Sequence, residues 1–216
     1  SRTYSGIEGF ANEISLGDYN GDGYIDLAVG AHLGSSKAGN VKLFRGSSSG
    51  PSTTVWMTLT GEATGDDFGS ELYSGDVNGD GYDDLVVGSP DYDVDKGRIY
   101  VHFGSSSGPG TVPDQLLTGA SGEDYGTDFQ VVGDLDGDGY DDLVVALEED
   151  NSNTGRLDIY SGGAAGLNTS APVVIYGSKV GGYFGKEFRA AGDINDDGFA
   201  DVLVQSSDVT ELFYGY

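Results

Sequence analysis

Short apolar segments alternate with polar, glycine-rich segments along the whole chain. In the stretch 68–119 this pattern predicts four strands, a short one at the end of 68–76 and three more at 84–89, 98–104 and 114–119. The second of them places Leu85, Val86 and Val87 in a row, which is typical of a strand covered on both faces. No segment keeps a helical period over about a dozen residues, so helices are not expected.

The same pattern recurs four times. A Gly-Asp pair opens a polar loop at Gly17, Gly75, Gly133 and Gly192, with spacings of 58, 58 and 59 residues. A period of this size indicates one structural unit copied along the chain. Four short antiparallel strands per unit predict an all-β fold, a β-propeller of four four-stranded blades. We expect one domain over 1–216, with repeats at about 7–61, 62–119, 120–177 and 178–216 plus 1–6.

The last repeat supplies only three predicted strands before the chain stops at Tyr216. The segment Arg2–Gly6 precedes the first repeat, where the other repeats have their preceding fourth strand. We therefore expect Arg2–Gly6 to complete the last blade and close the ring, because an open end leaves an unpaired strand edge. A frayed terminus is the alternative.

Composition narrows the function. The chain has 36 acids and 10 bases, a formal net charge of -26, which repels nucleic acid and anionic lipid and excludes a nucleic-acid partner. No stretch approaches the roughly 20 apolar residues of a membrane span, so no direct membrane insertion is expected. No basic-then-apolar leader opens the sequence, so a targeting peptide is expected to be absent or already removed. Cysteine is absent, so disulfides play no part.

The acids cluster in one loop per repeat, called here the first to fourth acidic loops and numbered from the first acid. Oxygen side chains at positions one, three and five, glycine at six, a carbonyl at seven and an acid at nine are typical of a calcium loop of the EF-hand kind. Position twelve of the second loop is Val87 instead of glutamate, so the acid at nine is expected to bind directly. The predicted ligands are Asp18, Asn20, Asp22, Tyr24, Asp26, Asp76, Asn78, Asp80, Tyr82, Asp84, Asp134, Asp136, Asp138, Tyr140, Asp142, Asp193, Asn195, Asp197, Phe199 and Asp201.

This oxygen-only ligand set favours Ca²⁺, about four ions with one per repeat, over Mg²⁺, which prefers tighter octahedral sites. Zn²⁺ is disfavoured because cysteine is absent and neither histidine lies in an acidic loop. An ion-free Asx-rich turn is the remaining alternative, although four copies with one spacing argue against it. Weak calcium sites would rarely fill in the cytosol, which indicates an extracellular or cell-surface location, with the periplasm also possible.

The combined motif resembles the FG-GAP repeat of integrin α-subunit propellers and related bacterial proteins, over nearly the whole chain. The "FG" element stands at Phe68-Gly69 and Phe184-Gly185, and in degraded form at Phe10-Ala11 and Tyr125-Gly126. The "VGAP" element stands as "VGAH" and "VGSP" and decays to "VALE" and "VQSS". The resemblance implies calcium in the loops between strands one and two, ligand binding on the opposite face, and adhesion or recognition outside the cell.

The chain departs from the integrin pattern, whose propellers have seven blades. It could be a complete four-bladed ring, a piece of a larger propeller or half of an assembled one, and its oligomeric state is not predicted.

The connections from strand two to three share a face with those from strand four to one, and they vary most between repeats, as binding loops do. Candidate contacts for a protein or glycan ligand are His32, Lys37, Tyr92, Lys96, Glu148 and Glu149; ordinary solvated loops are the alternative. No catalytic motif is present, so no enzyme is expected. We predict a non-catalytic binding or adhesion module, with a carbohydrate-binding lectin-type propeller or a structural subunit of a surface assembly as alternatives.

Overall fold

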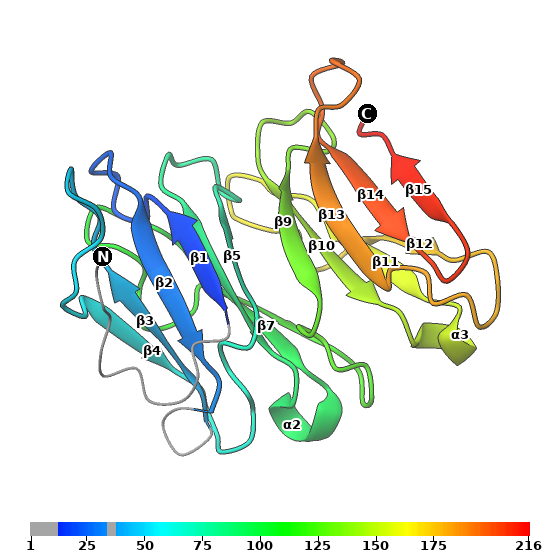
Figure 1. Ribbon diagram of the computed structural model, residues 1–216, viewed down its shortest axis with the longest axis horizontal. Coiled ribbons are helices and arrows are strands. Elements are labelled where there is room, and N and C mark those ends of the chain that lie inside the picture. Colours follow the sequence, from blue (N-terminus) through cyan, green and yellow to red (C-terminus); the bar gives the residue numbers. More distant parts are fainter. Residues whose placement is uncertain (1–12, 34–37) are drawn as a thin grey trace. The chain divides into compact units, whose positions relative to one another are not determined.

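The computed structural model describes residues 13–33 and 38–216. The chain divides into two compact units, Ser1–Gly75 with Gly81–Thr127 and Asp76–Asp80 with Asp128–Tyr216. Antiparallel sheets make up both units (Figure 1). The predictions for Arg2–Gly6, Phe10-Ala11 and Lys37 lie outside the described residues.

The first unit contains two four-stranded sheets, and each follows the order of the chain. Their strands are β1 (Ile14–Gly17), β2 (Asp26–Ala31), β3 (Asn40–Phe44) and β4 (Met57–Thr60), then β5 (Leu72–Gly75), β6 (Asp84–Ser89), β7 (Arg98–His102) and β8 (Gln115–Thr118). Every neighbouring pair is antiparallel. This is the strand order of a propeller blade.

The second unit contains one four-stranded and one three-stranded sheet of the same order. Their strands are β9 (Phe129–Gly133), β10 (Asp142–Leu147), β11 (Arg156–Tyr160) and β12 (Val173–Tyr176), then β13 (Glu187–Gly192), β14 (Asp201–Gln205) and β15 (Thr210–Phe213). The all-β class, one sheet per repeat and three strands in the last repeat are confirmed. Closure of a ring stays a prediction, because its fourth strand falls in Arg2–Gly6.

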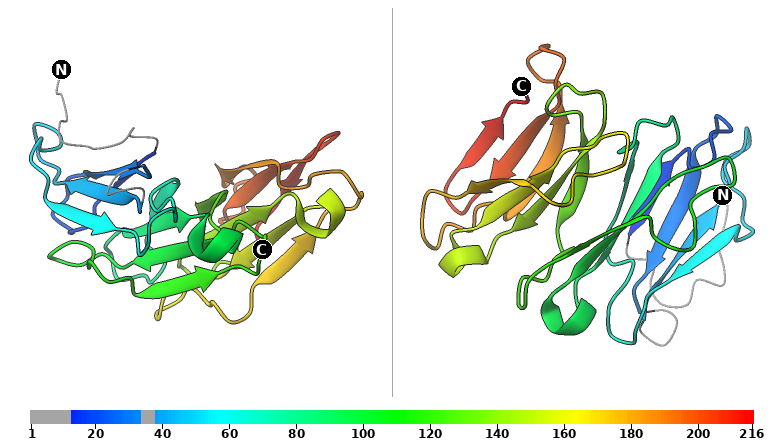
Figure 2. Two further views of the ribbon diagram at one scale, coloured as in Figure 1. Left: turned by 90° about the horizontal axis from the view of Figure 1, so that it is seen from below. Right: turned by 180° about the vertical axis from the view of Figure 1, so that it is seen from behind.

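Two four-residue helical turns, which the sequence did not predict, lie between the second and third strands of their sheets. They are α2 (Tyr92–Asp95) and α3 (Asp150–Asn153), visible at the ends of the sheets in Figure 2. Both contain successive residues with positive φ, Asp93 and Val94 in α2 and the three residues 151–153 in α3. They are therefore left-handed turns, which Asn and Asp tolerate and Val does not.

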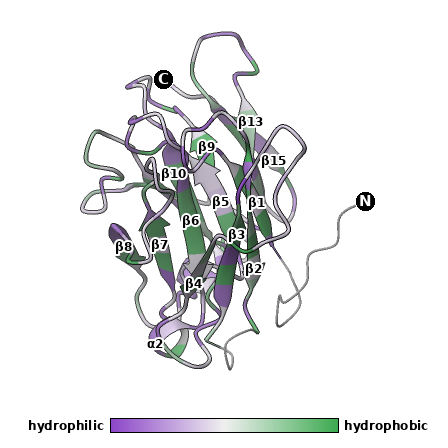
Figure 3. Ribbon diagram, turned by 90° about the vertical axis from the view of Figure 1, so that its left-hand side faces the viewer, coloured by the Kyte–Doolittle hydropathy of each residue, from purple (hydrophilic) through white to green (hydrophobic). Residues whose placement is uncertain are grey.

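The second strand of a sheet is its most buried strand. All six residues of β6 are buried, as the run Leu85–Val87 predicted. In Figure 3 the hydrophobic segments follow the strands, whereas the connecting loops are mainly hydrophilic. Separate clusters form the cores: one around Leu43, Phe68 and Val87 in the first unit, the other around Leu157 and Val204 in the second.

The "FG" element packs one sheet against the next inside each unit. The amide of Phe68 donates to the carbonyl of Ala38, and a Cβ on Gly39 would collide with the Phe68 backbone. Gly155 meets Phe184 in the same way, and Gly97 meets Tyr125. Tyr125 thus takes the place of phenylalanine in the degraded copy.

Candidate calcium centres

Each acidic loop joins the first two strands of its sheet and folds back onto its own first acid. The amide of position five donates to the position-one carboxylate in all four loops. The bonds are Asp22 to Asp18 at 3.1 Å, Asp80 to Asp76 at 3.1 Å, Asp138 to Asp134 at 3.1 Å and Asp197 to Asp193 at 3.0 Å. One backbone conformation therefore recurs at all four predicted sites.

Position six is the glycine of the sharp turn. Its φ is positive in every loop, at 82° for Gly23, 87° for Gly81, 91° for Gly139 and 96° for Gly198. In the third loop the Gly139 amide donates to the second oxygen of Asp134 at 2.9 Å. The glycine predicted from the sequence is thus required by the backbone.

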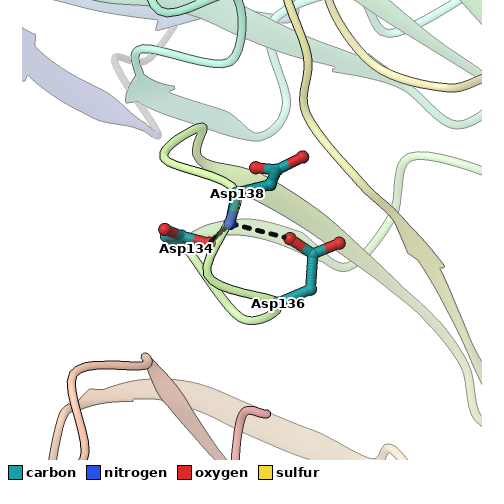
Figure 4. A group of neighbouring side chains, drawn as sticks. All are labelled: Asp134, Asp136 and Asp138. Atoms are coloured by element: carbon teal, nitrogen blue, oxygen red, sulfur yellow. Dashed lines mark hydrogen bonds between the residues drawn. The ribbon is translucent and has the colours of Figure 1, made fainter.

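The third loop brings its first three acids together (Figure 4). One carboxylate oxygen of Asp134, Asp136 and Asp138 lies within 4.8 Å of the others. Among the ion pairs of the described residues, none reaches these three carboxylates. Three carboxylates this close repel one another in the absence of a cation. Their hard oxygen atoms fit Ca²⁺, and these residues would hold it.

Position nine has a structural role in addition to the one predicted. Asp26, Asp84, Asp142 and Asp201 are all buried. The two carboxylate oxygens of Asp142 accept the amides of Gly162 and Leu135, each at 2.8 Å. These bonds tie the loop to the end of the third strand of its own sheet.

Burial raises the pKa of the Asp142 carboxyl to about 6, although the Gly162 and Leu135 amides lower it and Asp136 and Asp138 raise it further. Burial likewise raises the pKa of Asp26. Asp142 is not part of the three-acid cluster, so its direct binding of calcium stays a prediction. The same holds for the position-seven carbonyls of Tyr24, Tyr82, Tyr140 and Phe199.

The candidate ligand contacts lie apart from the acidic loops along the chain. The Arg98 guanidinium stacks over the Tyr92 ring at 3.6 Å, and Lys96 pairs with Asp93. Glu149 precedes the left-handed turn α3. The Nδ1 atom of His32 is buried and has no hydrogen-bond partner among the described residues.

A small pocket in the second unit lies between the connection that follows β12 and the loop that follows β14. Its volume is about 90 Å³. Its polar lining includes Ser178, Lys179, Ser206, Asp208 and Glu211, and the Lys179 ammonium pairs with the Asp208 carboxylate. The sequence pointed to these connections but not to this pocket, because it forms between segments about 29 residues apart.

Two positions of the acidic loops were missed. Position four has a positive φ in all loops, and position eight carries Asp83 and Asp141 in the second and third repeats. Position four contacts the following repeat in the first three loops, where alignment of the repeats shows glycine each time, whereas position eight varies in residue type and gives no such signal.

One antiparallel sheet occurs in each of the four repeats, with a calcium-type loop between its first two strands. This arrangement defines the class, an all-β repeat protein with acidic loops. The model of the FG-GAP repeat matches residues 10–44 and 68–102, and that of the FG-GAP-like repeat matches 134–204. The chain therefore belongs to the FG-GAP repeat family, of the integrin α-like kind.

Its relatives are integrin α subunits. The chain is 32% identical to human integrin alpha-IIb over 93% of its own length, and 28% identical to integrin alpha-5 of Xenopus laevis over 95%. It is 30% identical to integrin alpha-4 of Xenopus laevis over 70% of its length. The chain spans 20%, 20% and 15% of those three proteins. Across the described residues, no helix has the length and apolar character needed to cross a bilayer.

Proposed function

We propose that this chain is a calcium-stabilised extracellular module that binds a protein partner and catalyses no reaction. The observation that carries the proposal is the shared geometry of the four acidic loops, in a chain similar to integrin α subunits. Each loop would hold one calcium ion through its oxygens at positions one, three, five, seven and nine. The ion would offset carboxylate repulsion and fix the turn into the buried second strand.

The expected size of this stabilisation is large. A site with a Kd near 10 μM at about 1 mM free Ca²⁺ contributes roughly 2.7 kcal/mol by mass action. Four such sites rival the ~5–15 kcal/mol net stability of an ordinary domain. An extracellular or cell-surface location supplies calcium at that concentration, whereas the cytosol does not.

Calcium titration with elemental analysis tests the metal part of the proposal. We expect about four ions per chain, one per repeat, and weaker binding of Mg²⁺. Asp138→Ala should remove one ion because it removes an oxygen of the third loop. The control is Asp93→Asn, an exposed acid paired with Lys96 outside the acidic loops, which should keep the full number. Equal ion counts in both variants would refute the ligand assignment.

We place the partner surface on the connections from strand two to three and from strand four to one. Tyr92, Lys96, Glu148 and Glu149 lie in or beside these connections. The small pocket supports a protein ligand over a sugar, because its volume of about 90 Å³ is below the ~300–1,000 Å³ of ordinary small-molecule sites.

Binding of the calcium-loaded chain to extracellular proteins and to a glycan array tests the partner class. Saturable binding to a protein that Lys179→Glu weakens would support the proposal if Thr169→Glu leaves it unchanged, because Thr169 is exposed in the connection between β11 and β12, outside the proposed surface. Binding to glycans alone would favour a lectin, and self-association at micromolar concentration would favour a structural subunit.

We retain the four-bladed ring closed by Arg2–Gly6 as a proposal for the domain. A monomer near 22.4 kDa that loses stability when residues 1–6 are deleted would support it. A stable dimer would indicate that another copy completes the last sheet.

A further inference from the structure

Each of the first three acidic loops is covered by the next repeat along the chain. The aromatic ring at position seven of one loop lies on position four of the loop before it. A Cβ on Gly21 would lie 2.6 Å from the Tyr82 ring, a Cβ on Gly79 2.5 Å from the Tyr140 ring, and a Cβ on Gly137 closer still to the Phe199 ring. A side chain at position four is therefore excluded wherever the following ring is in place.

The backbone next to that ring makes a second connection. The position-eight amide donates to the carbonyl of the position-one acid in the preceding loop. These bonds are Asp83 to Asp18 at 3.2 Å, Asp141 to Asp76 at 3.2 Å and Ala200 to Asp134 at 2.7 Å. In addition, the Asp141 carboxylate accepts the amide of Asp76 at 2.9 Å. The next repeat thus holds the main chain of the first predicted ligand.

A third connection holds position two. Its carbonyl accepts an amide from the end of the following repeat's third strand, Ser105 to Tyr19 at 3.1 Å, Gly163 to Val77 at 3.0 Å and Tyr216 to Leu135 at 2.8 Å. We call the ring and these hydrogen bonds the clasp. The clasp surrounds positions one to four of a loop without supplying any ligand oxygen to it.

Within the second unit, the clasp joins two predicted sites directly. Phe199 lies on Gly137 of the third loop through its ring, and it is also position seven of the fourth loop. Its carbonyl is the predicted ligand of the fourth ion, so an ion there would fix the residue that covers the third loop. We propose that the third and fourth acidic loops bind calcium cooperatively through Phe199, a positioning residue. This inference rests on the proposed calcium function. It adds that calcium binding at either of these two sites strengthens calcium binding at the other.

The physical argument is one of shared ordering. A loop of five oxygens must adopt one backbone conformation to bind its ion, and that ordering costs conformational entropy. Once Phe199 is held by the fourth ion, part of the third loop is already ordered, so the third ion binds more tightly. Linkage requires the effect to be reciprocal.

The position-six glycines give a separate reporter for each loop. We would titrate the whole ¹⁵N-glycine-labelled chain with Ca²⁺ and follow the amides of Gly23, Gly139 and Gly198 by NMR. In Asp197→Ala we expect Gly198 to stop responding, and the Gly139 midpoint to rise by about fivefold or more. Asp138→Ala should raise the Gly198 midpoint by the same factor. Gly23 of the first loop serves as the control and should keep its midpoint.

Variants of Phe199 separate coupling from folding. Phe199→Ala removes the ring and leaves the carbonyl, so the Gly139 midpoint should become insensitive to Asp197→Ala. Phe199→Tyr restores the aromatic residue of the other three loops and should restore the coupling. A Gly139 midpoint that ignores Asp197→Ala in the otherwise wild-type chain, with Gly198 silenced, would overturn the inference. Failure of the calcium proposal would look different, because then none of the glycine amides would respond to Ca²⁺.

Discussion

The second and fourth acidic loops have the same backbone and different surroundings. Val77, at position two of the second loop, is 0% exposed, and its carbonyl accepts an amide of the following repeat. Ile194 has the same position in the fourth loop and is 56% exposed. Both loops carry the full predicted oxygen set, so the difference shows that a ligand list alone does not define a site. The support of the second loop comes from the following repeat.

Position four records the same difference in its residue type. Gly79 lies under the Tyr140 ring, whereas the fourth loop has Asp196 there, exposed and with a φ of 60°. A side chain is accommodated at this position only where no following ring covers it. The first repeat shows the complementary feature, because its position-seven and position-eight residues, Tyr24 and Ile25, are exposed.

Of the tests that compare the second and fourth loops, removal of calcium should have the largest effect on stability. Chelation should empty all four proposed sites and lower the melting temperature by about 20 to 40 °C, at ~2.7 kcal/mol each and roughly 2–4 °C per kcal/mol. Differential scanning calorimetry with and without chelator measures the change. Hydrogen exchange should show that the fourth loop opens before the second, because no clasp covers the fourth loop within residues 13–33 and 38–216. An unchanged melting temperature would exclude any stabilising ion.

A change of residue at position four should have the next largest effect on stability, and this effect should differ between the second and the fourth loop. Gly79→Ala places a Cβ at a φ of +70° against the Tyr140 ring, and we expect it to destabilise the protein by about 2 kcal/mol. Asp196→Gly should change stability by no more than about 0.5 kcal/mol, because no clasp depends on it. Urea unfolding in saturating calcium measures both. Equal effects would contradict the assignment of the ring to one loop and not the other.

Loss of the position-eight carboxylate should destabilise the protein less than the change at position four. Asp141→Ala removes the acceptor of the Asp76 amide and should cost about 1 kcal/mol, the usual contribution of one hydrogen bond. The fourth sheet has Ala200 at this position, so Ala200→Ser provides a matched change without a bond to lose. The calcium affinity of the second loop, read from the Gly81 amide, should fall in Asp141→Ala only.

A pH scan in chelator should give the smallest effect and should distinguish the acidic loops from a half-buried acid of the second unit, Asp128. Burial raises the pKa of Asp128 to about 7, with Arg189 lowering it and Glu148 and Glu187 raising it. The folded state therefore binds this proton more tightly than the unfolded state, so stability should rise as pH falls from about 8 to 5.

Asp128→Asn should abolish that part of the pH dependence, a difference of about 1 kcal/mol after allowance for solvent screening. Equilibrium unfolding of the wild-type chain and of Asp128→Asn at each pH separates the contribution of Asp128 from the general loss of charge repulsion. A wild-type profile that runs parallel to that of Asp128→Asn would show that the carboxyl titrates normally.

Much of the fold could be predicted from the sequence, because a strand or turn that is ambiguous in one repeat can be recognised from the corresponding residues of the other three. Four copies of one polar loop located the turn, and the run Leu85–Val87 located the buried strand. The left-handed turns were missed, since Val94 is a residue that rarely adopts positive φ.

A register change was missed as well. The "FG" element is seven residues before the Gly-Asp pair in the first two repeats and eight in the last two. The structure accommodates the extra residue by an irregular pairing between β9 and β10 and between β13 and β14. That count was available from the sequence and predicts a β-bulge.

The shared turn of the acidic loops could be predicted because residue types recur at a fixed spacing within one loop, whereas the binding of calcium by these residues stays a prediction. The clasp could not be predicted, because it joins residues such as Asp76 and Asp141 that are 65 positions apart. Position eight also varies among Ile, Asp, Asp and Ala, so no fixed residue type marks it.

The clasp also bears on how the chain is made. Since Phe199 and Tyr216 complete the surroundings of the third loop, that loop cannot mature while the last repeat is still on the ribosome or in a translocation channel. Each newly synthesised repeat would complete the clasp on the acidic loop of the repeat before it, while its own acidic loop would still lack a clasp. If the loops bind the proposed calcium ions, each ion would bind one repeat behind synthesis, and a tandem duplication would add one loop together with the residues that cover the loop before it.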